Sequence, residues 1–166
     1  MRNVLIALLV SGLALFGQGP VPRPATEFKI VEATGKTTML SECKGRVVLL
    51  AFISTQCPHC QRASVVFEQL LHEFAGKVHV AEVAFNENAD TADFAKRFGL
   101  TFPVGTSTND QAHDFLGITR GTRLGTPQVV AIDKTGMIRA QSERLGSPIL
   151  QTHDYLRELL KAMGAR

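Results

Sequence analysis

The chain has 166 residues, of which 45% are hydrophobic and 20% are charged, and its formal net charge at pH 7 is +3. This length and balance predict one globular domain with enough apolar material for a core. The basic residues form no dense run, so nothing beyond a mild positive charge supports nucleic-acid binding. The three cysteines are too few for a disulfide scaffold.

The start of the chain has the pattern of a targeting segment. One positive charge, Arg2, precedes the mostly apolar run 4–16. This pattern is typical of a signal peptide, and the run is shorter than the roughly 20 residues that a spanning helix needs. We therefore expect a signal peptide or an uncleaved N-terminal anchor at 1–19, a linker at 20–26, and an extracytoplasmic domain at 27–166.

The first half of the domain alternates between strand and helix patterns. A short alternating strand is expected at 27–31, and the nearly all-apolar run 47–53 predicts a central strand covered on both faces. A helix follows, because apolar residues from Phe67 to Phe74 recur at spacings of three and four. Its apolar stripe predicts packing against the sheet.

The second half continues the same alternation and ends in a hairpin and a helix. The expected elements are strands at 78–85, 128–133 and 137–141 and helices starting at Asp90, Asp110 and Ser147. Parallel units followed by a hairpin predict an α/β fold with a mixed central β-sheet flanked by helices on both faces.

Two cysteines, Cys57 and Cys60, lie between the expected strand 47–53 and the helix. A Cys-x-x-Cys pair at a strand-to-helix turn is typical of a redox dithiol. Unpaired N–H groups and the positive end of the macrodipole stabilise a thiolate at a helix N-terminus. We therefore expect Cys57 to be the acidic nucleophile and Cys60 to be the shielded, resolving thiol.

The two residues between the cysteines refine this expectation. Pro58 suits the first helical turn, where no N–H is needed. His59, when protonated, adds positive charge beside the Cys57 sulfur, which makes it the tuning residue; the alternative is a solvated histidine without a role. Cysteines in such positions have pKa values of roughly 3.5–7.5, and stabilising the thiolate makes the disulfide more oxidising.

The other cysteine and the other histidines do not form the pattern of a metal site. Zinc needs a second pair of ligands, but Cys43 is alone and no two histidines have a suitable spacing. We expect no metal and no organic cofactor. Cys43 is either a further redox thiol, one that pairs between chains, or a half-buried loop residue, and we favour the last interpretation.

These motifs resemble the thioredoxin fold, and the chain is similar to extracytoplasmic TlpA/ResA-type thioredoxin-like proteins from about Ala25 to Leu160. Residues 49–52 resemble the family's strand into the active site. Residues 99–104 resemble the insert that separates this subfamily from plain thioredoxins, and 125–133 resemble the segment that holds the family's cis-proline. The resemblance implies a thioredoxin-like fold.

The resemblance also implies substrate-binding residues and partners. Pro127 would be the cis-proline beside Cys57, and the Thr126 backbone would offer strand-like hydrogen bonds to an extended substrate. Pro58 would join them as a substrate-binding residue. The partners would be protein thiols and disulfides and an unidentified redox partner, for which a membrane protein is one option.

Departures from the family's pattern bear on the direction of electron flow. In thioredoxins an acid that accepts the proton of the buried thiol lies six residues before the first cysteine, and in ResA-type reductases it lies three residues after the second. This chain has Ala51 and Ala63 at these two positions. Their loss predicts slower attack by Cys60 on a mixed disulfide. Gln56 replaces the usual tryptophan, and the Cys-Pro-His-Cys motif resembles that of DsbA-type oxidases, whose long helical insertion is missing.

The sequence thus predicts a thiol-disulfide oxidoreductase that acts on extracytoplasmic proteins. A peroxiredoxin-like peroxidase is one alternative, but its cysteine needs a Pro-x-x-x-Thr/Ser-x-x-Cys frame, and only Ser54 of that frame precedes Cys57. A Cu(I) or zinc carrier is the other, because the thiolates of Cys57 and Cys60 with one histidine would suit a soft metal.

Overall fold

The computed structural model describes residues 19–166. The expected signal peptide or anchor therefore lies, except for its last residue, outside the described residues. Within 19–166, no helix combines the length and the apolar character needed to cross a membrane.

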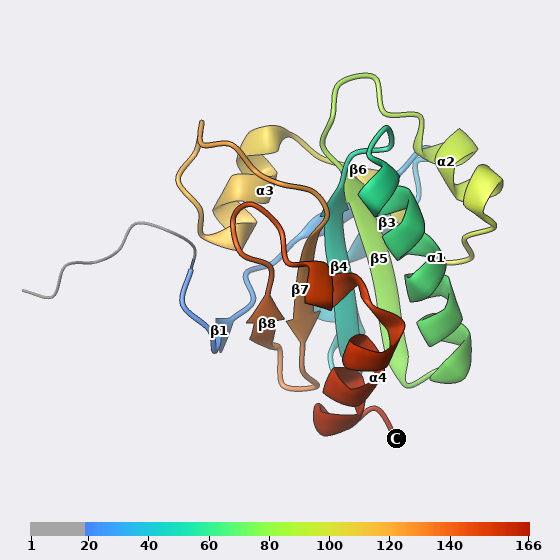
Figure 1. Cartoon of the computed structure of the whole chain (residues 1–166), viewed down its shortest axis with the longest axis vertical. Helices are drawn as coiled ribbons and strands as arrows, with labels where there is room; N and C mark the ends of the chain where they lie inside the picture. The colour runs from blue at the N-terminus through green and yellow to red at the C-terminus, as the bar shows by residue number, and fades with distance from the viewer. Residues whose placement is uncertain (1–18) are drawn as a thin grey trace, which may run out of the picture.

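A mixed eight-stranded sheet forms the centre of the molecule (Figure 1), with the strand order β1-β8-β7-β4-β5-β6-β2-β3. The strands are β1 (Arg23–Pro24), β2 (Lys29–Glu32), β3 (Thr37–Met39), β4 (Val47–Ile53), β5 (Val78–Ala84), β6 (Val104–Thr106), β7 (Gln128–Ile132) and β8 (Met137–Gln141). β4 is parallel to β5 and antiparallel to β7. The predicted mixed α/β sheet is confirmed.

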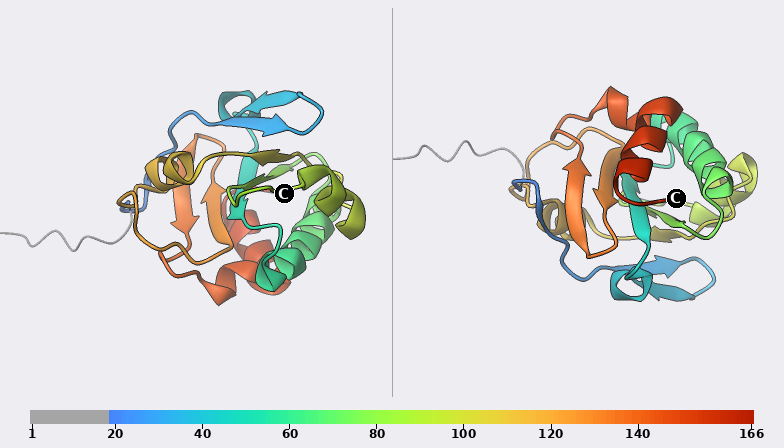
Figure 2. Two further views of the ribbon diagram at one scale, coloured as in Figure 1. Left: turned by 90° about the horizontal axis from the view of Figure 1, so that it is seen from above. Right: turned by 90° about the horizontal axis from the view of Figure 1, so that it is seen from below.

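Helices cover both faces of this sheet, as predicted. The α-helices are α1 (Pro58–Glu73), α2 (Thr91–Phe98), α3 (Asn109–Leu116) and α4 (His153–Ala162), and the 3-10 helices are η1 (Leu40–Cys43) and η2 (Pro148–Gln151). α1 and α4 lie side by side on one face, and α3 lies on the other (Figure 2).

The central strand β4 divides the core into two layers. All seven of its residues are buried. Because successive side chains of a strand point to opposite faces, Leu49 and Ala51 pack with α1 and α4, whereas Leu50 and Phe52 pack with α3. An all-apolar strand is therefore required here, since neither face meets water.

Aromatic and aliphatic side chains fill the two layers differently. On the α3 side, the rings of Phe28, Phe52 and Phe115 lie with their centroids 5.2 to 5.4 Å apart. On the α1 side, Phe67 of α1 and Leu156 of α4 are completely buried against β4. Both layers anchor the strand that leads into the Cys57 turn.

Local signals set several helix ends. Asp90 accepts a hydrogen bond from the Asp93 amide at 2.9 Å and caps α2, and Gly99 ends the helix with a φ of 63°. The final helix departs from its expected start at Ser147: Thr152 is extended, so η2 ends before it and α4 begins at His153.

The segment expected as a linker adds an edge strand to the sheet. Arg23 and Pro24 form β1 and pair with β8. The Arg23 guanidinium donates to the Gln141 side-chain oxygen at 2.6 Å and to the Phe115 carbonyl at 3.1 Å. Ordered structure therefore begins several residues before Glu27.

Close packing between β2 and β6 yields a stability prediction. A Cβ on Gly105 would lie 2.7 Å from Ile30 Cγ2 and 2.8 Å from the Val31 carbonyl oxygen. Gly105→Ala should therefore push β2 from β6 and lower the free energy of unfolding by about 1–3 kcal/mol, as for other overpacked sites. Chemical denaturation checks this, and an unchanged midpoint would contradict the tight packing.

Candidate active site

The two cysteines lie where β4 passes into α1. Cys57 is the extended residue immediately before the helix, with φ −83° and ψ 119°, and Pro58 is the first helical residue. Cys57 is half-buried, whereas Cys60 is fully buried one turn into the helix. Both thiols are free. This is the division between an accessible and a shielded thiol that the sequence predicted.

The turn before Cys57 is braced from two directions. The Cys57 amide donates to the Ser54 carbonyl at 3.0 Å. The Thr55 amide donates to Asn86 Oδ1 at 3.0 Å, and the Gln61 side chain donates to the Thr55 carbonyl at 3.1 Å. Asn86 follows β5, so the neighbouring parallel strand helps to hold the turn. No role for Asn86 was predicted from the sequence.

The segment around Pro127 leads into β7, the strand that pairs with β4 on the side opposite β5, and reaches the same place. The Thr126–Pro127 peptide bond is cis. The Cys57 thiol donates to the Thr126 carbonyl over 3.6 Å, although the two residues are 69 positions apart in the chain. Thr126 is half-buried, Pro127 is buried, and Pro58 is exposed beside Cys57. The structure thus brings together the predicted nucleophile and the predicted substrate-binding residues.

A buried amide holds this segment against the loop that follows β8. The Nε2 group of Gln128 lies 2.7 Å from the Gly125 carbonyl oxygen and 3.0 and 3.1 Å from the carbonyl oxygens of Glu143 and Arg144. A Cβ on Gly125 would lie 2.1 Å from the Leu145 carbonyl oxygen, so only glycine fits there. Sequence analysis missed the roles of Gly125 and Gln128, because the partner loop is distant in sequence.

The environments of the two thiols shift their acidities in opposite directions. Burial raises the pKa of Cys57, but hydrogen bonds favour its thiolate and bring the net pKa below the ordinary value. These bonds come from the Thr126 side chain, the Cys60 amide and thiol, and the His59 amide. Burial raises the pKa of Cys60 to about 12. Cys57 therefore ionises at a lower pH than Cys60.

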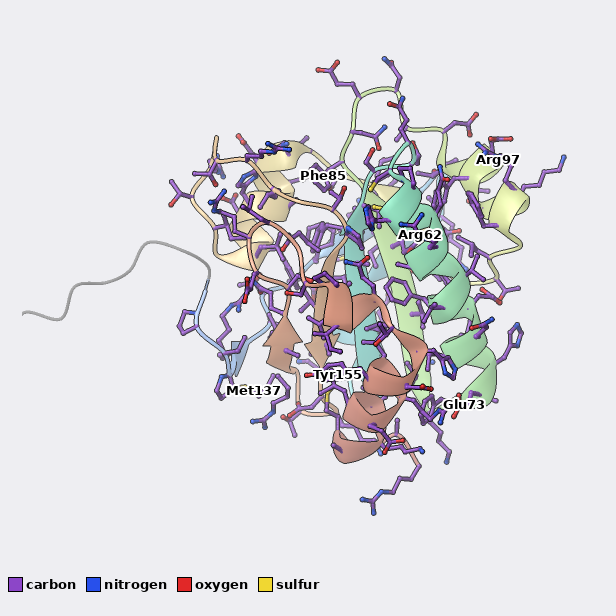
Figure 3. All side chains as sticks on the ribbon, viewed as in Figure 1. Arg62, Glu73, Phe85, Arg97, Met137 and Tyr155 are labelled. Carbon is purple, nitrogen blue, oxygen red and sulfur yellow. The ribbon has the colours of Figure 1, made fainter. Side chains whose placement is uncertain are left out.

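The expected tuning residue, His59, contacts Arg62, which lies three residues further along α1. Arg62 Nη2 lies 3.1 Å from His59 Nδ1. A guanidinium has only donors, so the imidazole accepts through Nδ1 in this contact. Arg62, labelled in Figure 3, carries a positive charge near the start of α1. Both side chains are exposed, and sequence analysis gave Arg62 no role.

A buried carboxyl group lies on the strand next to β4. Glu82 of β5 is fully buried and pairs across the sheet with Ala51. The Ser64 hydroxyl lies 2.7 and 2.9 Å from the two carboxyl oxygens of Glu82. Burial raises the Glu82 pKa to about 8, and the Ser64 hydrogen bond lowers it less. One acidic residue inside the apolar run of β5 was the signal that sequence analysis overlooked.

The third cysteine lies apart from this site. Cys43 belongs to η1 and packs in the layer on the α3 side of the sheet, whereas Cys60 packs on the α1 side. It is buried rather than half-buried, and burial raises the pKa of its thiol. Among residues 19–166, no three His, Cys, Asp or Glu side chains gather in a way that could hold a metal ion.

The opposed acidities predict which thiol ionises first. The thiolate absorbance near 240 nm should begin to rise below the ordinary thiol pKa of ~8.5 in the wild type and in Cys43→Ser. The rise should vanish in Cys57→Ser, because Cys60 and Cys43 stay protonated in that range. A pH titration of each reduced variant checks this, and a rise that persisted in Cys57→Ser would contradict the assignment.

The Glu82 carboxyl predicts a pH-dependent stability. Its folded pKa, about 8, exceeds its unfolded value of 4.5, so the folded state binds the extra proton in that window. The resulting stability is fully present below pH 4.5 and is lost as pH rises to about 8, at most about 1.4 kcal/mol per pH unit. Glu82→Gln should flatten this decline in denaturation at pH 5, 6.5 and 8, whereas the half-buried control Glu68→Gln should keep it.

Comparisons with known proteins agree with this geometry. The AhpC/TSA family profile matches residues 21–141. The thiol-disulfide oxidoreductase ResA of Geobacillus thermodenitrificans (strain NG80-2) is 27% identical over 150 residues, which cover 84% of this chain and 83% of the relative. A Xenopus laevis protein named as glutathione peroxidase 8-B is 30% identical over 88 residues. These residues cover 46% of this chain and 42% of the relative.

Solved structures share the fold. The thiol:disulfide interchange protein of the thioredoxin family from Chlorobium tepidum TLS superposes with a TM-score of 0.73 at 23% identity, covering 88% of this chain and 99% of its own. The predicted thioredoxin-like fold and the predicted likeness to ResA-type proteins are thereby confirmed. The chain therefore belongs to the AhpC/TSA family of thioredoxin-like oxidoreductases, with thiol-disulfide oxidoreductases among its relatives.

Proposed function

We propose that this protein is a thiol-disulfide oxidoreductase that acts on extracytoplasmic proteins through Cys57 and Cys60. The observation that carries the proposal is the pairing of a half-buried thiol at the start of α1, with a lowered pKa, and a fully buried thiol one turn later with a pKa of about 12. The ResA likeness supports the same chemistry.

The reaction follows from this asymmetry. The Cys57 thiolate attacks a substrate disulfide, one substrate sulfur leaves as a thiolate, and a mixed disulfide with Cys57 remains. Cys60 then loses its proton and attacks the Cys57 sulfur. The second substrate sulfur leaves, the substrate is reduced, and the Cys57–Cys60 disulfide has formed. Run in reverse, the same steps oxidise a dithiol substrate.

The surface around Cys57 suits an extended polypeptide. The Thr126 backbone lies beside Cys57 and would pair with a substrate strand, next to Pro127 and Pro58. The loop after β8 packs its backbone against Gly125 and carries one apolar side chain, Leu145, which is 62% exposed. The Gly125 amide donates to the Arg144 carbonyl at 2.9 Å and holds that loop in place. We infer that protein thiols and disulfides are the substrates.

The direction of electron flow depends on the charges around Cys57. A protonated His59 would favour an oxidant, and Arg62, which contacts His59, places a further cation near the start of α1. We propose that both residues tune the dithiol. A redox partner, for which a membrane protein is one option, then sets the physiological direction.

The proposed cellular compartment rests on the N-terminal sequence. We propose that residues 1–19 act as a signal peptide or anchor and deliver the domain to an extracytoplasmic compartment, where disulfide exchange is common. The likeness to ResA supports this assignment.

Peroxidase activity is the second candidate, because a relative is named as a glutathione peroxidase. Ser54 lies three residues before Cys57, yet no proline completes the frame that a peroxidatic cysteine needs. Rapid consumption of hydrogen peroxide by the reduced protein, lost in Cys57→Ser, would favour this candidate. Slow consumption at the rate of a free thiol would exclude it.

Variants of the two cysteines test the main proposal. Cys57→Ser should abolish disulfide exchange with a protein substrate, because no nucleophile remains. Cys60→Ser should retain the first attack and accumulate mixed disulfides, which appear on non-reducing gels and disappear on reduction. If both variants turned over substrate like the wild type, the dithiol would not be the reactive site.

The reduction potential tests the tuning. We expect a value between roughly −120 and −180 mV, the range of oxidants and isomerases, if the cationic surroundings of Cys57 stabilise its thiolate. Arg62→Gln should then lower the potential, whereas Arg139→Gln, a change at a cation paired with Asp133 in the β7–β8 hairpin, should leave it unchanged. A wild-type value near −270 mV would indicate a reductase.

A further inference from the structure

The buried pair of Glu82 and Ser64 has no part in the mechanism above, although it adjoins Cys60. Glu82 follows Val80 and precedes Ala84 on the face of β5 that packs against α1, in the same apolar layer as Cys60. Ser64 lies one helical turn after Cys60 and is also fully buried. Burying a carboxyl group in such an apolar layer lowers the stability of the fold unless hydrogen bonds compensate for the lost water.

The hydrogen atoms available to this pair permit two arrangements. Ser64 Oγ lies 2.7 Å from one Glu82 carboxyl oxygen and 2.9 Å from the Cys60 carbonyl oxygen. A hydroxyl has one proton and cannot donate to both. When Glu82 is protonated, it donates to Ser64, and Ser64 donates to the Cys60 carbonyl. When Glu82 is ionised, the Ser64 proton turns to the carboxylate, and the Cys60 carbonyl loses this donor.

We propose that Glu82, acting through Ser64, is a positioning residue for Cys60, and that Cys60 resolves mixed disulfides most readily while Glu82 is neutral. The inference rests on the proposed disulfide exchange. In the step concerned, the Cys60 S–H bond breaks, the Cys57–Cys60 bond forms, and the bond between Cys57 and the substrate breaks. The substrate sulfur leaves with the bonding electrons, the Cys60 proton passes to solvent or to that sulfur, and Glu82 is unchanged.

Charge repulsion supplies the reason. The sulfur of Cys60 gains negative charge as it attacks, and an ionised Glu82 in the same low-dielectric layer opposes that charge. A neutral Glu82 removes the repulsion and completes the hydrogen-bonded chain to the turn that carries Cys60. The pKa of about 8 for Glu82 means that the neutral form predominates at pH 7.

Within the part of the chain that the structure describes, the surroundings of Glu82 provide no other charge to compensate it. β4 and β6 carry no ionisable side chain, and His79 of β5 points to the opposite face of the sheet. Cys57 and Cys60 are the titratable groups of α1 in this layer. The remaining ionisable residues of α1 and α2 are exposed or half-buried: His59, Arg62, Glu68, His72, Glu73, Asp93, Lys96 and Arg97.

This arrangement revises an expectation from the sequence. Ala51 and Ala63 occupy the two positions at which related proteins place an acid, which predicted slow attack by Cys60. Glu82 pairs with Ala51 across the sheet, and Ser64 follows Ala63 on the helix. An acid therefore does reach this layer, but from the neighbouring strand.

Two-phase kinetics with Ellman's reagent separate the two cysteines. In the reduced protein, Cys57 attacks the reagent and releases one coloured thiolate, and Cys60 then displaces the second. The first phase tests the proposed nucleophile, and the second tests the inference. If the wild type showed no second phase, or if the second phase persisted in Cys60→Ser, the proposed function itself would be wrong.

Glu82→Gln, which keeps the shape and removes the charge, is the decisive variant. The wild-type second phase should accelerate less steeply with pH above about 8, where Glu82 ionises. In Glu82→Gln this break should vanish, so that its second phase exceeds the wild-type rate about tenfold at pH 9, the factor for one pKa unit, and matches it at pH 6. The control Glu68→Gln, on the helix α1 that also carries Cys60, should keep the wild-type profile.

Other outcomes would overturn the inference. A Glu82→Gln profile parallel to the wild type at every pH would show that the carboxyl only fills space. Ser64→Ala provides an independent test: without the Ser64 donor the ionised carboxyl is less stable, so the break should move to higher pH. An unmoved break in Ser64→Ala would remove Ser64 from the proposal.

Discussion

The parallel pairing of β4 with β5 is the constraint on which the rest of the site depends. It brings the carboxyl ends of both strands to one edge of the sheet, where Cys57 immediately precedes α1 and Asn86 holds the preceding turn. The same register places Glu82 beside Ala51, beneath the helix that carries Cys60. Because β4 is buried on both faces, a one-residue shift of this register would move each of its side chains into the opposite packed layer, so the geometry is strongly specified.

The chemistry depends on how one helical turn separates the two thiols. Cys57, before the first turn, meets unpaired amides and solvent, and these favour its thiolate. Cys60 lies one turn deeper, where burial raises its pKa to about 12. One thiol is therefore ready to attack, while the other needs help to lose its proton. The neutral Glu82–Ser64 pair would leave that step unopposed, because it places no second negative charge in the layer of Cys60.

Contacts between distant segments complete the site. Thr126 reaches Cys57 from the segment just before β7, and Gln128 and Gly125 hold that segment against the loop after β8. Arg62 contacts His59 one turn along α1 and supplies a cation that the Cys-Pro-His-Cys motif alone would assign to histidine. The active site thus combines a local motif with supports from three separate parts of the chain.

The sequence by itself determined the local features: the all-apolar β4, the apolar stripe of α1, the position of Cys57 and Cys60 between them, and the end of α2 at Gly99. Each follows from periodicity or from a residue's own backbone preference, which neighbours in the chain express. Only the tertiary structure decided that Glu82 lies beside Ala51, that Ser64 links it to Cys60, and that Arg23 begins an edge strand. Periodicity tells which face of a strand is buried, but the pairing of strands and the packing of a helix on them determine which buried side chains meet.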